Sequence, residues 1–109
     1  MSSKREEFYK KVKFEDGYAF VNKDGKRINK KGYYYIYDFY EGICVIYDGK
    51  KFGTMDIHGN EIIPCKYDYI GNYHNGVAYS CLDNEYNYID KEGKIVPTVK
   101  EINIKKRIK

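Results

Sequence analysis

The chain has 109 residues and a formal net charge of +4, a length that suits one domain with a single core. It contains 14 Tyr and 5 Phe, but only two Ala, one Leu and no Trp. Because Ala and Leu favour helices whereas Tyr, Phe, Ile and Val favour strands, this composition excludes a mostly helical domain and predicts an all-β fold. No apolar run approaches the roughly 20 residues of a membrane span, and the charged start does not lead into a signal-peptide core. We therefore expect a cytoplasmic protein.

The first 13 residues are basic and allow two interpretations. Ser3 and Glu6 have the spacing of a capping box, and Phe8 and Val12 lie four residues apart, as on one face of a helix. An internal repeat of 34 residues instead aligns residues 9–14 with a strand-like segment further along the chain. We favour a strand that begins at about residue 9.

The repeat is most visible at three turns, because Gly25, Gly59 and Gly93 are each 34 residues apart. Each turn follows an aromatic residue, an apolar residue three positions later, and then Asp or Asn. Repeats of this length stack as units that share a core. We predict about two and a half repeats that form stacked antiparallel β-hairpins in one domain. The predicted divisions are a basic N-terminal segment, a repeat domain and a basic C-terminal strand or tail, at residues 1–13, 14–97 and 98–109.

The predicted strands flank these turns, with Gly at the position that favours positive φ. Residues 52–57 pair with residues 61–64, and the segment before Gly93 pairs with residues 95–96. Apolar and polar residues alternate only weakly over residues 43–47, which predicts a strand buried on both faces. Further turns are predicted at residues 15–17, 48–50 and 83–84.

Residues 51–68 carry a family resemblance, with the sequence KFGTMDIHGNEIIPCKYD. This segment resembles the WG β-repeat, also called the KWG repeat, whose units run Lys-Trp-Gly, an aromatic residue, Ile, Asp, a Gly turn, Val-Ile-Pro and Tyr-Asp. Units of that family are often joined through Phe-x-Glu-Gly, which is similar to residues 39–42. The resemblance extends over residues 14–97. It implies stacked antiparallel hairpins and a role in interactions, and it implies no reaction, cofactor or catalytic residue.

The sequence departs from the family in one systematic way, because it has no Trp. Only Gly53 keeps the Gly that follows the Trp in the family pattern. Tyr and Phe can still supply a large flat anchor, so we expect the fold to be kept. The residues in place of the Trp are Tyr18, Phe52 and Tyr86.

Residues 33–40 hold six aromatic side chains and provide the candidate binding site. The repeat aligns Tyr33, Tyr35 and Ile36 with similar residues 34 positions later, which favours a structural role for them. Three further tyrosines of this segment, named at the end of the paragraph, instead align with polar or small residues 34 positions later. Tyr is enriched at interface hot spots, so we predict that these residues form an exposed patch that binds a partner protein. Ordinary Tyr-rich packing is the alternative. The predicted partner-binding residues are Tyr34, Tyr37 and Tyr40.

No residue pattern in the chain is typical of catalysis, a metal site or a cofactor. The cysteines are odd in number and lack C-x-x-C spacing, which predicts reduced thiols. The recurring Asp residues sit where turns need local hydrogen bonds. We therefore expect no enzyme, no metal and no cofactor, with a small hydrolase that uses Cys or His as the remaining catalytic alternative. The residues in question are Cys44, Cys65, Cys81, His58 and His74.

The positive charge lies at the two ends of the chain. Residues 14–97 contain 10 basic and 13 acidic side chains, whereas both termini are basic. The leading hypothesis is a small non-enzymatic protein–protein interaction module that could inhibit or adapt a partner by occupying it, and that could self-associate through edge strands. The alternative is a salt-sensitive RNA or DNA binder that uses basic termini and exposed tyrosines. The nucleic-acid candidates are Lys105, Lys106, Arg107 and Lys109, together with the lysines of residues 10–13.

Overall fold

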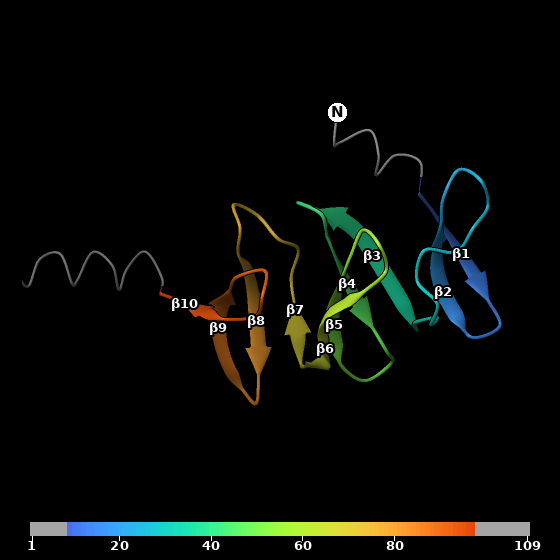
Figure 1. Ribbon diagram of the computed structural model, residues 1–109. Helices are drawn as coiled ribbons and strands as arrows, with labels where there is room; N and C mark the ends of the chain where they lie inside the picture. The colour runs from blue at the N-terminus through green and yellow to red at the C-terminus, as the bar shows by residue number, and fades with distance from the viewer. Residues whose placement is uncertain (1–8, 98–109) are drawn as a thin grey trace, which may run out of the picture.

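A computed structural model of the chain describes residues 9–97, and this part consists of strands and turns with no helix (Figure 1). The all-β prediction is confirmed. A two-stranded sheet comes first, with β1 (Lys10–Phe14) and β2 (Gly17–Val21). The middle sheet has the order β3 (Tyr35–Tyr40), β4 (Ile43–Tyr47), β5 (Phe52–Asp56) and β6 (Glu61–Tyr67). The third sheet contains β7 (Tyr69–Ile70), β8 (Ala78–Leu82), β9 (Glu85–Ile89) and β10 (Ile95–Val96), in the order β10-β9-β8-β7.

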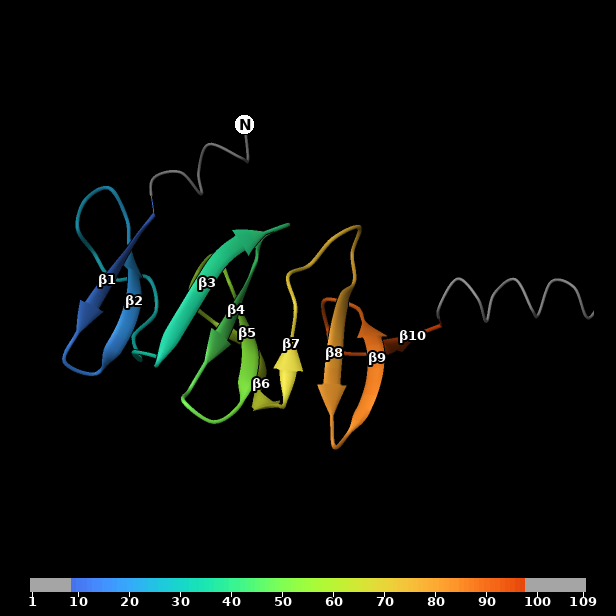
Figure 2. The ribbon, with the colours of Figure 1, turned by 180° about the vertical axis from the view of Figure 1, so that it is seen from behind.

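The three sheets follow one another along the molecule in chain order. Figures 1 and 2 show β1 and β2 at one end, the middle sheet next to them, and β8 to β10 at the other end. All strand pairs within the sheets are antiparallel. The hairpins are thus arranged as a stack, as the sequence predicts.

The pairing register repeats with the period seen in the sequence. The central hairpin of each sheet contains an equivalent pair of opposed residues, and these pairs are 34 positions apart. They are Lys10 with Val21, Cys44 with Met55, and Ala78 with Ile89. Tyr18 likewise pairs with Tyr33 as Phe52 pairs with Tyr67. The 34-residue interval is therefore a period of the backbone pairing and not only of the residue types.

The recurring turns are closed by one side chain each. The Oδ1 atoms of Asn22, Asp56 and Asp90 each accept hydrogen bonds from the backbone N–H groups two and four residues later, at 2.9 to 3.0 Å. A carboxylate or amide oxygen can make this local bond, which explains why Asp or Asn recurs before each Gly turn. The turn chemistry is thus the same in all three copies.

Two hydrophobic clusters join the sheets. One contains Phe20 of β2 with residues of β3, β4 and β5, so it lies between the first and middle sheets. The other combines residues of β4 with residues of β7, β8 and β9, so it lies between the middle and third sheets. Strand β4 supplies both, because Cys44 and Ile46 enter the first cluster while Ile43 and Val45 enter the second. This confirms the predicted burial on both faces.

Two details at strand ends resolve points that the sequence left open. Residues 10–14 form β1, so the strand interpretation of this segment is right and the helix interpretation is wrong for these residues. The return strand expected at residues 61–64 continues through Pro64 to Tyr67. Strand β6 is at the edge of its sheet, where a missing N–H removes no ladder bond.

The division of the chain into segments at residues 14 and 97 stays a prediction. Within residues 9–97, no helix has the length and apolar character to cross a membrane.

Candidate interaction surface

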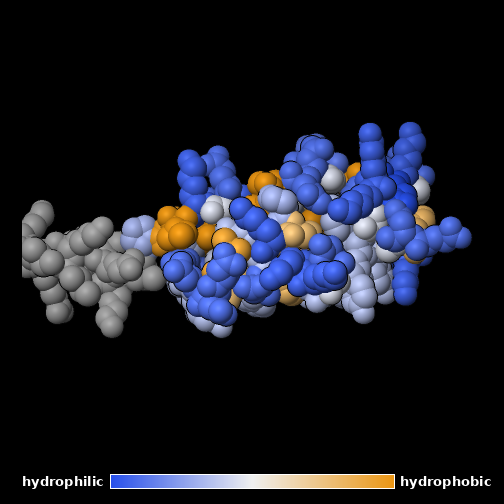
Figure 3. Space-filling view, turned by 90° about the horizontal axis from the view of Figure 1, so that it is seen from below, coloured by the Kyte–Doolittle hydropathy of each residue, from blue (hydrophilic) through white to orange (hydrophobic). Residues whose placement is uncertain are grey.

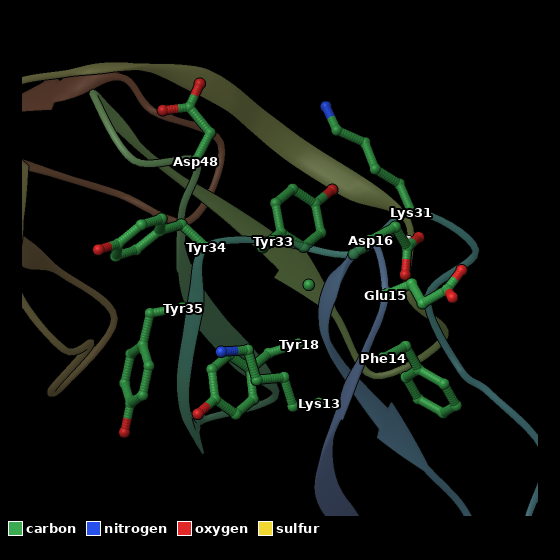
Figure 4. Close-up of a pocket in the computed structure, with 12 residues that line it drawn as sticks. Lys13, Phe14, Glu15, Asp16, Tyr18, Lys31, Tyr33, Tyr34, Tyr35 and Asp48 are labelled. Atoms are coloured by element: carbon green, nitrogen blue, oxygen red, sulfur yellow. Dashed lines mark hydrogen bonds between the residues drawn. The ribbon is translucent and has the colours of Figure 1, made fainter.

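A surface groove of about 610 Å³ lies where the first sheet meets the middle sheet (Figure 4). Tyr34 and Tyr35 stand on one side of it, and Phe14, Glu15 and Asp16 stand on the other. The remaining lining residues come from the first hairpin, the segment before β3 and the turn after β4, and they are Lys13, Gly17, Tyr18, Lys31, Gly32, Tyr33 and Asp48.

The backbone segments that flank the groove approach closely at two glycines. A Cβ atom on Gly17 would lie 2.5 Å from the carbonyl oxygen of Tyr33, and one on Gly32 would lie 2.5 Å from that of Asp16. The equivalent positions one repeat later are Lys51 and Lys66. The close approach that shapes the groove thus depends on glycines that the middle repeat does not keep.

The acidic side chains of the groove are held in place by local bonds. Asp16 accepts hydrogen bonds from both terminal nitrogens of Arg27 at 3.2 Å and from the N–H of Gly32 at 2.9 Å. The bond from Arg27, followed by that from Gly32, lowers the pKa of the Asp16 carboxyl below its usual range. Asp48 accepts the backbone N–H groups of residues 50 and 51, which lowers its pKa as well. As an anion, Asp16 therefore ties the first hairpin to the segment before β3, whereas Asp48 closes the turn after β4.

The groove continues into a connected set of aromatic rings, which we call the aromatic row. Its members pack edge to face, tilted or stacked with centroid distances between 4.5 and 6.3 Å, a geometry that adds to the stability gained by burial. Phe52 is its centre, because it contacts three other rings of the row. The aromatic row consists of Tyr18, Tyr34, Tyr35, Tyr37, Tyr47, Phe52 and Tyr69.

The structure brings together two of the three predicted binding residues. Tyr34 is 71% exposed, lines the groove and contacts Tyr47, which contacts Phe52. Tyr37 is half-buried against the same Phe52. Tyr40 is 45% exposed but lies at the far end of β3, and no ring contact joins it to another aromatic residue of residues 9–97. It lies six positions after Tyr34, a separation of about 20 Å along an extended chain. The three tyrosines therefore do not form one patch, and their role in binding stays a prediction.

The repeat alignment separates the buried tyrosines from the exposed ones only in part. It assigns structural roles to Tyr33, Tyr35 and Ile36, and Tyr33 and Ile36 are indeed buried. Tyr35, however, is 37% exposed and lines the groove. The register of β3 against β4 shifts between Ile36 and Phe39, so both of these residues point into the core although they are three positions apart. Simple alternation along the strand therefore fails at this point.

Sequence reasoning about residues 33–40 also missed several members of the aromatic row. Tyr18 and Phe52 carried a signal, because they occupy the recurring aromatic position in front of the Gly turn. Tyr69 carried one as well, because it lies 34 positions after Tyr35. Tyr47 carried none at this interval, since only the pairing of β4 with β5 brings its ring to Phe52. A search for aromatic residues at the repeat interval would have found Tyr18, Phe52 and Tyr69.

Two of the three thiols are poorly suited to nucleophilic chemistry. Cys44 is buried and its sulfur donates to the carbonyl oxygen of Tyr37 at 3.1 Å. Burial raises the pKa of the Cys44 thiol to about 12 and that of Cys65 to about 11, so both stay protonated near neutral pH. Among residues 9–97, no group of three or more His, Cys, Asp or Glu side chains is placed to hold a metal ion.

The basic candidates for nucleic-acid binding divide between two regions. Lys105, Lys106, Arg107 and Lys109 lie outside the described residues. In β1, Lys11 pairs with Asp38 at 2.8 Å and lies over the ring of Tyr35, whereas Lys13 lies over the ring of Tyr18. Two of the lysines of β1 are thus engaged with neighbouring side chains.

Comparison with known proteins supports the resemblance seen in the sequence. Residues 52–86 match the family model described as "WG containing repeat". This segment runs from the aromatic residue at the start of β5 to the equivalent residue in β9, which is one full period of the pairing register. No curated protein and no solved structure matches the chain significantly. Residues 52–86 are therefore similar to a WG containing repeat.

Proposed function

We propose that this chain, which carries a WG containing repeat, is a small non-enzymatic module that binds a partner protein through the groove and the adjacent aromatic row. The observation that carries the proposal is the continuity of the two features, because Tyr34 and Tyr35 belong to both. WG repeats are often found in protein-interaction contexts, and stacked repeats commonly offer extended surfaces to partners.

The chemistry of the surface suits a protein partner. Tyrosine provides a large contact area and a hydroxyl for hydrogen bonding at low cost in side-chain entropy. The groove has both basic and acidic walls, with Lys13 and Lys31 near Glu15 and Asp16. Mixed charge of this kind can match polar groups on a folded protein, whereas a polyanion would be repelled by the carboxylates.

A partner bound along this surface would be occupied without being chemically changed. Two acidic groups in the groove have perturbed pKa values. Asp16 is kept ionised by Arg27 and the N–H of Gly32, and Asp48 by the N–H groups of its turn, so neither is poised to exchange protons near neutral pH. The module would therefore act as an inhibitor or adaptor in the cytoplasm.

The proposal is tested by affinity purification from cells that naturally express the protein, with the tagged chain as bait. Wild type should recover a specific protein in near-stoichiometric amount, and Tyr34→Ser should reduce that recovery at least tenfold. Tyr40→Ser is the matched control, since Tyr40 is also an exposed tyrosine but lies away from the groove. Equal recovery with wild type and Tyr34→Ser, with both proteins folded by circular dichroism, would contradict the proposal.

A second candidate function is salt-sensitive binding of RNA or DNA through the basic termini. It is favoured by the segregation of charge, because residues 14–97 are net acidic and the excess of basic residues lies outside them. It predicts a mobility shift with oligonucleotides that weakens steeply as salt rises and is lost when residues 105–109 are deleted. No shift at low salt with single- or double-stranded probes would exclude it.

A further inference from the structure

The third sheet carries tyrosines on the face that points away from the middle sheet. Side chains alternate along β8 and β9, so Ala78 and Ile89 pack toward the middle sheet while their neighbours point the other way. We call this outer surface the terminal tyrosine face. It consists of Tyr79, Cys81, Tyr86 and Tyr88.

The rings of this face are close together and accessible. Tyr79 stacks on Tyr86 at 5.8 Å and meets Tyr88 edge to face at 5.3 Å. Their side chains are 43%, 63% and 40% exposed, respectively. Figure 3 shows that apolar side chains also gather at this end of the described part. The exposed Ile95 of the edge strand β10 is not on the terminal tyrosine face, because its pairing with Ile89 places it on the other side of the sheet. The terminal tyrosine face therefore presents an exposed aromatic surface.

The repeat shows what such a face does elsewhere in the molecule. The residue of the middle sheet equivalent to Tyr79 is Val45, which is only 2% exposed. Val45 belongs to the cluster that joins the middle sheet to Ala78 and Ile89 of the third sheet. The same side of the sheet is thus covered by the next sheet in one copy, whereas no described residue stacks on it in the other.

We infer that the terminal tyrosine face is where a second copy of this chain binds, with the two identical faces packed together around a twofold axis. The face contains no charged side chain, so two copies can meet without burying like charges. Identical patches that contact each other in this way are the commonest basis of homodimers. The inference does not use the groove and is independent of the proposed partner.

Head-to-tail stacking of copies is the competing arrangement, and Lys10 opposes it. Lys10 occupies the position equivalent to Cys44 and Ala78, which are buried where one sheet packs on the preceding sheet. A copy that docked its first sheet on the terminal tyrosine face would therefore bury the ammonium group of Lys10. Removing such a charge from water costs several kcal/mol unless it gains an ionic partner, and the face offers none.

The experiment measures the mass of the full-length chain in solution by light scattering over a hundredfold range of concentration. Wild type should reach twice the mass of the chain and no more. Tyr86→Lys places like charges on both sides of the contact, so it should remain at the mass of one chain over the same range. Tyr34→Lys, which adds the same charge at an exposed tyrosine in the groove, should dimerise as wild type does.

Three outcomes would overturn the inference. Wild type could stay monomeric at every concentration, which would mean that another occupant covers the face. Tyr86→Lys could dimerise as strongly as wild type while remaining folded. Wild type could also grow beyond a dimer as its concentration rises, which is the behaviour of head-to-tail stacking.

Discussion

At the scale of single residues, the clearest constraint is the absence of a side chain at Gly53. This is the Gly that follows the anchor aromatic residue Phe52 in the WG pattern. A Cβ atom there would lie 2.4 Å from the carbonyl oxygen of Ile63 on the neighbouring strand. The pairing of β5 with β6 is irregular at this point, with a register shift between Phe52 and Thr54. The Gly therefore lets two strands approach more closely than any other residue would allow.

We expect Gly53→Ala to lower the free energy of unfolding by about 1–3 kcal/mol, because the backbone of β6 must move to admit the methyl group. Urea unfolding followed by tyrosine fluorescence measures this change, since the chain has no Trp. Gly71→Ala is the matched control. Its added Cβ would meet only the end of the Tyr69 side chain, at 3.3 Å, so its effect should be clearly smaller. Equal losses for the two variants would contradict the steric explanation.

A second constraint at this scale is the carboxylate of Glu41, which links the middle sheet to the segment before β8. It accepts hydrogen bonds from the backbone N–H groups of Asn75 at 2.6 Å and Gly76 at 2.8 Å, and Lys91 lies 3.6 Å away. The bond from Gly76 and then that from Asn75 lower the pKa of Glu41. Because the folded pKa lies below the unfolded value, the stabilisation is complete above an unfolded pKa of about 4.3 and is lost as pH falls through the folded pKa.

The melting temperature should therefore fall as pH is lowered from 6 to 3, and Glu41→Gln should flatten part of that dependence. Gln keeps an acceptor oxygen but carries no charge to titrate. Thermal melts by circular dichroism at several pH values measure this. Asp24→Asn is the control, since the Asp24 carboxylate makes no described hydrogen bond or ion pair. A pH profile of Glu41→Gln that matches wild type would show that Glu41 does not contribute.

At the scale of the element, each hairpin depends on the side chain that closes its turn. Asn22, Asp56 and Asp90 make the same pair of bonds, although one is an amide and two are carboxylates. The turn therefore requires an oxygen acceptor at this position and not a negative charge. This is a local requirement, and it explains why the turns could be located from the sequence.

We expect Asp56→Asn to be nearly neutral and Asp56→Ala to lower the free energy of unfolding by about 1 kcal/mol, through the loss of the bonds to the N–H groups of residues 58 and 60. Chemical denaturation of the two variants side by side provides the measurement. If Asp56→Asn were as destabilising as Asp56→Ala, the charge and not the hydrogen bond would be the stabilising feature of the turn.

At the scale of the whole molecule, stability depends on the middle sheet, because its two faces supply both hydrophobic clusters. Within residues 9–97, each outer sheet contributes to only one of these clusters. The sheets should therefore unfold together and not one after another, as expected for a short stack of mutually dependent units.

This arrangement predicts one cooperative unfolding transition that is the same by tyrosine fluorescence and by circular dichroism. Ile46→Ala, which removes a fully buried side chain from the cluster between the first and middle sheets, should lower the free energy of unfolding by about 2–5 kcal/mol without separating the transition into steps. Ile62→Ala, at a residue 36% exposed on β6, should cost much less. Two resolved transitions in wild type would show that the sheets unfold independently.

The binding surface is also a property of the whole molecule. The aromatic row takes its members from the first, middle and third sheets, from Tyr18 of β2 to Tyr69 of β7. The candidates predicted from the sequence come from one short segment, and the structure connects Tyr34 and Tyr37 but leaves Tyr40 apart. A surface assembled across sheets cannot be found by reading any one strand.

The sequence by itself determined the all-β class, the 34-residue period and the positions of the turns. These depend on local chemistry: strand-favouring residues, Gly at positive φ and an Asp or Asn acceptor before it. Each of these signals lies within a few neighbouring residues, so no knowledge of packing is needed to interpret it.

Only the tertiary structure decided which tyrosines are exposed. The register shift between Ile36 and Phe39 changes the direction of the side chains along β3, and the packing of adjacent sheets decides whether a given face is covered. Equivalent residues such as Val45 and Tyr79 therefore have opposite environments, because a sheet stacks on one and none of the described residues stacks on the other. Exposure is a property of the stack, whereas the hairpin is a property of the repeat.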